Sequence, residues 1–135
     1  PIARKKKDFT SYTVSEDGKS SITKYNVEKK FRHLSKVSFY PKTERTHQIR
    51  VHATYLGYSI FGDMKYEGGF SKTRGFLPEF TNYYKKKMKK FNRHALHATR
   101  LEFTHPTTKL PVTFESTLPS DFLNLMNSIE SFYDE

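Results

Sequence analysis

The sequence predicts an α+β fold, with a mixed, largely antiparallel sheet and a few packed helices in one domain. Segments of alternating apolar side chains and segments with helical spacing both occur in the 135 residues. No Pro/Gly/Ser-rich linker separates them. Phe and Tyr contribute 12 and 9 residues, and such large rings can build a core although only 35% of the residues are hydrophobic.

Two antiparallel strands are expected in the first third of the chain. The Asp17-Gly18 pair is typical of a turn, and the run at 22–27 that follows is rich in β-branched and aromatic residues. A second run at 35–40 alternates in the same way and ends at Pro41. The side chains expected to share a face within each run are Thr23, Tyr25 and Val27, and Ser35, Val37 and Phe39.

A short helix is expected next. Thr46 can cap its N-terminus, and Gly57 can adopt the left-handed conformation that ends it. The residues expected on its buried face are Ile49, Ala53 and Leu56. Arg50 and His47 then lie on the flanks of the helix, so we expect Arg50 to project toward the edge of a groove.

A second helix is expected after a loop. Residues 68–77 contain three glycines and predict the loop, and Pro78 can occupy the first turn of a helix that runs to Phe91. Its apolar face carries Phe80, Tyr83, Tyr84 and Met88, and its other face carries Lys85, Lys86, Lys87, Lys89 and Lys90. A solvated face that keeps the domain soluble and a surface for RNA phosphates are both open interpretations of these lysines.

The last third predicts a hairpin and a helix. The run at 94–103 is expected to form a strand, Pro106 to Lys109 turn the chain, and Val112 and Phe114 mark the returning strand. A final helix is expected to begin at Pro119-Ser120-Asp121.

Charge limits the classes of partner. Lys and Arg number 24 against 14 Asp and Glu, which gives a net charge of +10, and this excess favours RNA or another polyanion. No apolar run is long enough to span a bilayer, no signal peptide follows Pro1, and cysteine is absent. We therefore expect a cytoplasmic protein, or one in an RNA-containing organelle, and the start at Pro1 suggests a fragment.

The densest group of polar side chains lies at residues 45–52. Arg45-Thr46-His47-Gln48-Ile49-Arg50-Val51-His52 contains two guanidinium groups, two imidazoles and one amide. Arginine offers a planar fork of donors to phosphate or carboxylate. From the chemistry alone, a solvated basic helix face is an equal alternative. The two histidines lie five positions apart and no carboxylate partner follows, so no metal site is expected.

The order of these residues resembles a known family. Residues 45–52 match the RTHQIRVH signature of RluA-type RNA pseudouridine synthases, and 56–63, LGYSIFGD, is similar to the family's LGHPIxGD. Tyr66, then RHALHA at 93–98 and THP at 104–106, match later blocks in the same order. The resemblance covers nearly the whole chain and corresponds to the C-terminal half of that family's catalytic fold.

The resemblance implies a cofactor-free isomerase that flips a uridine out of structured RNA and converts it to pseudouridine. It also implies that Arg50 pairs with a catalytic Asp from an HRLDxxTSG segment in the N-terminal half. Such a pair would lower the pKa of the carboxylate and fix its direction. The RNA contacts expected in this chain are Arg45, His47, Gln48, Arg93, His97, Lys86, Lys87 and Lys90. The RNA itself is ribosomal or transfer RNA.

Several departures qualify this expectation. The chain contains no HRLD segment, so we expect it to be inactive without the N-terminal half. Glu44 replaces a glycine of the family pattern, and residues 69–92 resemble a basic insertion. Asp63 is interpreted as part of a turn and not as a substitute nucleophile. An RNA-binding module without catalytic activity is the alternative function.

Overall fold

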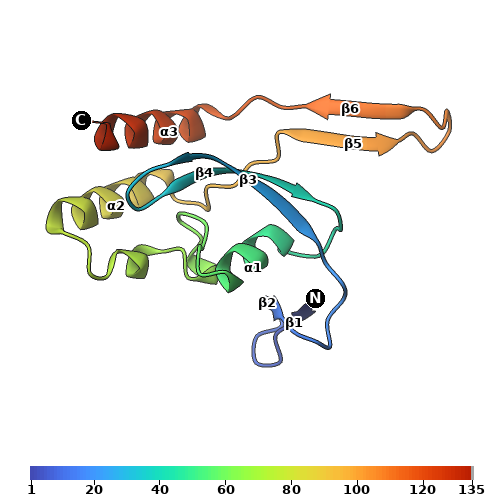
Figure 1. Cartoon of the computed structure of the whole chain (residues 1–135), viewed down its shortest axis with the longest axis horizontal. Helices are drawn as coiled ribbons and strands as arrows, with labels where there is room; N and C mark the ends of the chain where they lie inside the picture. Colours follow the sequence, from blue (N-terminus) through green and yellow to red (C-terminus); the bar gives the residue numbers. More distant parts are fainter. Residues whose placement is uncertain (135) are drawn as a thin grey trace. The chain divides into compact units, whose positions relative to one another are not determined.

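The computed structural model describes residues 1–134, and in this range three α-helices accompany three two-stranded antiparallel sheets, which confirms the α+β class (Figure 1). The chain divides into two compact units, residues 1–94 and the part from Ala95 onward. No helix in the described part of the chain has the length and apolar character needed to cross a membrane.

The first unit contains two small sheets. Strands β1 (Ile2–Arg4) and β2 (Tyr12–Val14) form one of them. Strands β3 (Thr23–Lys30) and β4 (Ser35–Pro41) form the other, with Tyr25 opposite Phe39 and Val27 opposite Val37. The faces expected from the alternation therefore do pair across the hairpin. On β3, Tyr25 and Val27 are 59% and 38% exposed, whereas Val37 and Phe39 on β4 are partly buried.

Helix α1 (Gln48–Tyr55) packs against the β1–β2 sheet. The buried cluster there consists of Ile2, Val51 and Tyr66, with Tyr12 and Val14 against it. Gly57 follows the helix with φ 87°, and its amide donates to the carbonyl of Thr54, which confirms the expected stop.

The start and the buried face of α1 differ from the expectation. His47, and not Thr46, precedes the first helical residue, with a left-handed φ of 54° and no side-chain capping bond. A contact to Tyr66 holds its ring in this position. Leu56 is 56% exposed, and Gln48 and Val51 are buried in its place. Ala53 is buried as expected.

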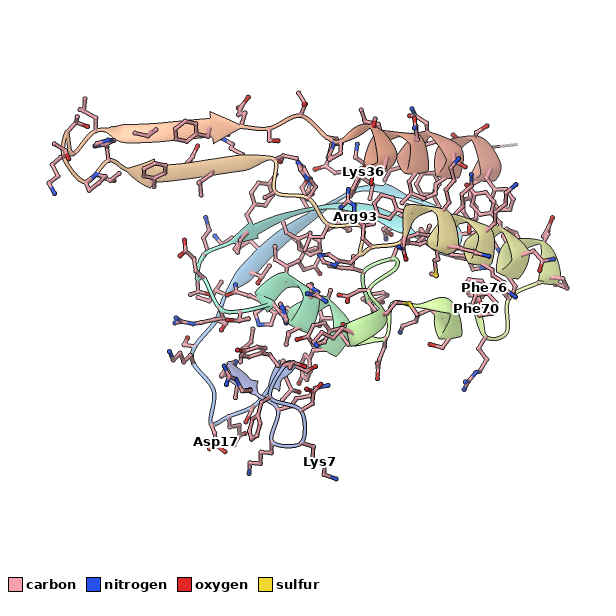
Figure 2. The ribbon with its side chains drawn as sticks, turned by 180° about the vertical axis from the view of Figure 1, so that it is seen from behind. Lys7, Asp17, Lys36, Phe70, Phe76 and Arg93 are labelled. Carbon is pink, nitrogen blue, oxygen red and sulfur yellow. The ribbon has the colours of Figure 1, made fainter. Side chains whose placement is uncertain are left out.

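The rest of the first unit carries two short 3₁₀ helices, η1 (Met64–Tyr66) and η2 (Phe70–Thr73), followed by α2 (Pro78–Phe91). The last of these has the bounds that the sequence predicts, with Pro78 in its first turn and Tyr84 and Phe91 buried. Figure 2 shows Phe70 and Phe76 on the same side of the unit, next to α2.

The second unit contains the hairpin β5 (Arg100–Thr104) and β6 (Pro111–Glu115), and then α3 (Ser120–Tyr133). The expected strand at 94–103 begins only at Arg100. Its partner strand ends at Glu115, and the last ladder contact is the amide of Ser116 donating to the carbonyl of Thr99. Residues 94–98 therefore lie beyond the end of the β5–β6 ladder.

Candidate functional site

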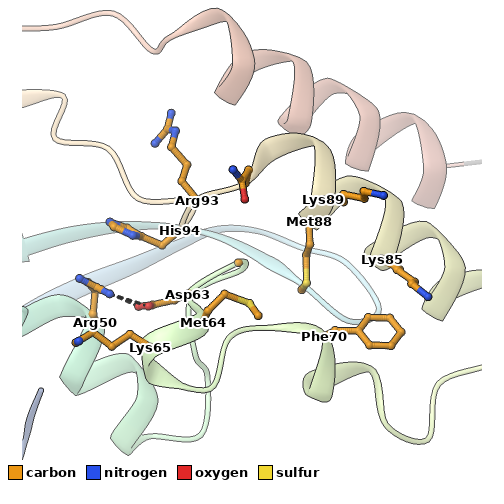
Figure 3. A pocket seen from close by; sticks show the side chains of 12 residues that line it. Arg50, Asp63, Met64, Lys65, Phe70, Lys85, Met88, Lys89, Arg93 and His94 are labelled. Carbon is orange, nitrogen blue, oxygen red and sulfur yellow. Dashed lines mark hydrogen bonds and ion pairs between the residues drawn. The ribbon is translucent and has the colours of Figure 1, made fainter. Parts of the chain in front are cut away.

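The centre of the candidate site is an ion pair between Arg50 on α1 and Asp63. The Arg50 Nε donates to Oδ2 of Asp63 and Nη2 donates to Oδ1, both at 2.8 Å (Figure 3). The Asp63 side chain is 1% exposed and that of Arg50 is 14% exposed. These bonds raise the pKa of Arg50 above its usual value, although burial acts in the opposite direction. The guanidinium is therefore held as a fixed, permanent cation.

A tight loop presents the carboxylate. The amide of Asp63 donates to the carbonyl of Ile60, and the amide of Gly68 donates back to the carbonyl of Asp63 at 2.7 Å. The amide of Gly62 reaches the carbonyl of Gly68 across the same loop. The backbone of Asp63 thus forms the turn that the sequence predicts. Its side chain makes no turn or cap bond and instead pairs with Arg50, which the sequence interpretation did not foresee.

A second contact to Arg50 comes from Tyr66. The Cζ of Arg50 lies 4.9 Å from the centroid of this ring. The Tyr66 hydroxyl lies 2.6 Å from Nδ1 of His47 and accepts a hydrogen bond from the amide of Tyr12. Tyr66 is 3% exposed, and burial raises its pKa. Tyr66 thus connects Arg50 and the start of α1 to the β1–β2 sheet.

Gln48 and His52 face the β3–β4 side of α1. Gln48 is buried, and its Nε2 donates to the carbonyl of Ile22 and the hydroxyl of Thr23. Its Oε1 accepts from the hydroxyl of Thr43 and the amide of Arg45. All four hydrogen-bonding positions of the amide are therefore used within the protein. The expected RNA contact of Gln48 has no free group in this arrangement.

His52, which was not among the expected RNA contacts, bonds through Nδ1 to the hydroxyl of Thr23 at 2.7 Å. The other expected contacts are spread more widely. Arg45 Nε donates to the carbonyl of Ser20. Arg93 lies with its Cζ 4.5 Å from the Phe91 ring centroid. His97 belongs to the second unit, with its Nε2 3.5 Å from the Ser116 hydroxyl.

A pocket opens beside the ion pair, with a volume of about 420 Å³. It lies within the first unit, between the loop at 62–65 and the second half of α2 (Figure 3). Arg50, Asp63 and Arg93 line it, together with His94. Burial, and then the charge of Arg50, lowers the pKa of His94. Lys85 and Lys89 also line it, whereas the expected contacts Lys86, Lys87 and Lys90 do not.

The sequence named Asp63 and Tyr66 without a role at Arg50, and it named Lys85 and Lys89 only as members of the lysine face of the helix. Asp63 lies thirteen residues after Arg50 and on a different element, so no helical or strand spacing connects the two. The side of α2 that faces the pocket depends on the packing of η2 against it. Within residues 1–134, no group of His, Asp and Glu side chains has an arrangement that could hold a metal ion.

The chain is similar over its whole length to RNA pseudouridine synthases. It is 37% identical over 134 residues to "Ribosomal large subunit pseudouridine synthase D" of Blochmanniella floridana, with 98% of this chain and 40% of the relative covered. It is 40% identical over 129 residues to "Uncharacterized RNA pseudouridine synthase YlyB" of Bacillus subtilis, with 96% and 37% covered. The synthase D of Salmonella typhimurium is 30% identical, with 100% and 40% covered.

No family model matches the chain. The similarity to these relatives nevertheless shows homology to RNA pseudouridine synthases along the whole chain. The chain spans about 40% of the length of the relatives it matches.

Proposed function

We propose that this chain is the C-terminal part of the catalytic domain of an RNA pseudouridine synthase, which converts uridine to pseudouridine in structured RNA. The observation that carries the proposal is the fixed, partly exposed guanidinium of Arg50 at the edge of a pocket, in a chain homologous throughout to such enzymes. The names of several relatives include the large ribosomal subunit, and ribosomal RNA is therefore the first substrate to test.

Arg50 is proposed to pair with a catalytic aspartate that lies outside these 135 residues. An arginine side chain has five N–H donors, and Asp63 accepts two of them, which leaves three. Within residues 1–134 no other hydrogen bond from this side chain is found. The guanidinium of Arg50 therefore has N–H donors for a second carboxylate. The function of Asp63 in this proposal is to fix the direction of Arg50, and it is a positioning residue.

The proposed RNA contacts are Arg45, His47, Arg93, His97, Lys86, Lys87 and Lys90. The lysines are charged groups on α2, and their contacts to phosphates would add affinity without selecting a sequence. The role proposed for Gln48 is structural: its side chain joins α1 to the β3–β4 hairpin.

The test is a map of pseudouridine in large-subunit ribosomal RNA and in transfer RNA after incubation with the full-length protein. Arg50→Ala should lower the rate of formation by about 100-fold or more, because a positioned charge at the reacting group is lost. Arg74→Ala is the matched control: Arg74 is exposed and does not line the pocket, so this variant should keep the wild-type rate.

Wild-type rates in Arg50→Ala would contradict the role given to Arg50. A full-length protein that binds RNA tightly but forms no pseudouridine in either RNA would contradict the proposed reaction. That second result would favour the RNA-binding module instead.

A further inference from the structure

The pocket beside Arg50 and Asp63 has an excess of positive charge. Five cationic side chains line it, contributed by Arg50, Lys65, Lys85, Lys89 and Arg93. Among the described residues that line it, Asp63 carries the one carboxylate, and both of its oxygens accept hydrogen bonds from Arg50. A concave site in which cationic side chains outnumber carboxylates concentrates anions. The pocket therefore favours an anion.

Two of these cations form a pair on one face of α2. Lys85 and Lys89 lie four residues apart, one helical turn, and both are exposed and line the pocket (Figure 3). Like charges at this spacing repel each other. An anion between the two ammonium groups would remove this repulsion and accept a charge-assisted hydrogen bond from each. Lys86 and Lys90 have the same spacing on the same helix but do not line the pocket.

The wall beside the two lysines is apolar. It consists of Met64, Met88 and Phe70, and Met64 and Phe70 are 75% and 40% exposed. The Lys85 Nζ lies 5.7 Å from the Phe70 ring centroid, so the cationic and apolar parts of the lining adjoin. Thioether and aromatic surfaces suit the face of a nucleobase or a ribose, since they adapt to its shape and stack on it.

The volume of about 420 Å³ is in the range of ligand pockets, which hold roughly 300–1,000 Å³. An inorganic anion alone would leave the apolar wall unused. The combination of paired ammonium groups with an adjoining apolar wall fits a phosphate that carries a nucleoside.

We propose that this pocket binds a nucleotide, with its phosphate between Lys85 and Lys89 and its nucleoside against Met64, Met88 and Phe70. The phosphate can belong to an RNA strand or to a free nucleotide. The assignment to RNA rests on the proposed function. The phosphate site itself stands on the geometry of the pocket.

The test is a titration of the full-length protein with uridine, with uridine 5′-monophosphate and with a short single-stranded oligouridylate, followed by NMR. The monophosphate should bind about tenfold or more tightly than uridine, because only the former carries the charged acceptor. Replacement of both pocket lysines, Lys85→Met with Lys89→Met, should abolish that difference. Lys6→Met with Lys7→Met removes the same charge from two exposed lysines that do not line the pocket and should preserve it.

Equal affinities for uridine and its monophosphate in the wild-type protein would overturn the site. So would a difference that survives in the Lys85→Met, Lys89→Met variant. Competition between the oligouridylate and the monophosphate would assign the site to an RNA strand, and a lack of competition would reject RNA as the source of the phosphate. None of these readouts requires pseudouridine formation, so a failure of the proposed reaction remains distinguishable from a failure of this site.

Discussion

Asp63→Asn tests whether the buried carboxylate holds Arg50 in place. The substitution keeps one oxygen at nearly the same position, so it retains at most one of the two hydrogen bonds at 2.8 Å. The new amide nitrogen is a donor and faces the guanidinium, which is also a donor. A hydrogen bond to a charged group contributes about 1.5–3 kcal/mol, and removing one partner of a fully buried ion pair costs about 3–5 kcal/mol. Because the Arg50 side chain is 14% exposed, water offsets part of that larger value.

We therefore expect Asp63→Asn to lower the free energy of unfolding by about 2–3 kcal/mol. The measurement is urea denaturation of the full-length protein at neutral pH. Glu102→Gln is the matched control, since it removes the carboxylate of the exposed Arg100–Glu102 pair and should change stability by at most about 0.5 kcal/mol. Equal effects of the two substitutions would refute the view that Asp63 holds a partly desolvated cation.

Two further predictions concern the loop that ends at Gly68 and the turn that begins at Asp8. Gly68→Ala should destabilise the protein by roughly 3 kcal/mol in the same assay, because its Cβ would lie 1.9 Å from the carbonyl oxygen of Ile60. Gly75→Ala is the control: its Cβ would meet no atom within 4 Å, so it should cost only about 1 kcal/mol of stability, from the positive φ. Equal losses of stability in the two variants would contradict the predicted clash at Gly68. The hydroxyls of Thr10 and then Ser11 lower the pKa of Asp8 from 3.8 to about 2, so its contribution to stability is present above about pH 4 and is lost as the pH falls toward 2. Asp8→Asn should remove that part of the pH dependence, and a carboxyl titration of Asp8 with a midpoint near 3.8 would contradict the assignment.

The elements predicted best are those whose signals are local. Helix α2 begins at Pro78 and ends at Phe91 as expected, because a proline in the first turn and a face of aromatic residues both act within the segment. The β5–β6 hairpin likewise follows from alternation and from the turn at 106–109, and the β3–β4 pair follows from alternation. The β1–β2 pair was not expected, because residues 1–15 are polar and basic. The strand expected from residue 94 fails over its first six residues because a strand needs a partner, and the partner ends at Glu115.

The pairings of the site could not be predicted in the same way. Arg50 and Asp63 meet because a loop closed by Gly62 and Gly68 turns the carboxylate toward α1. The position of His47 depends on a hydroxyl nineteen residues further along the chain. Such contacts are set by tertiary packing, and neither residue type nor spacing encodes them in a single sequence.

The segment Arg45–His52 divides into groups that build the fold and groups that are open to a ligand. Gln48 was expected among the RNA contacts as part of the motif that resembles the RluA-type signature. It is buried, and its four hydrogen bonds join α1 to the first hairpin. Val51 packs in the core, and His52 bonds to β3. Arg50 keeps donors that no described residue uses. A matched motif therefore identifies a local structure, and each side chain in it must be placed by its own contacts before it is given a chemical role.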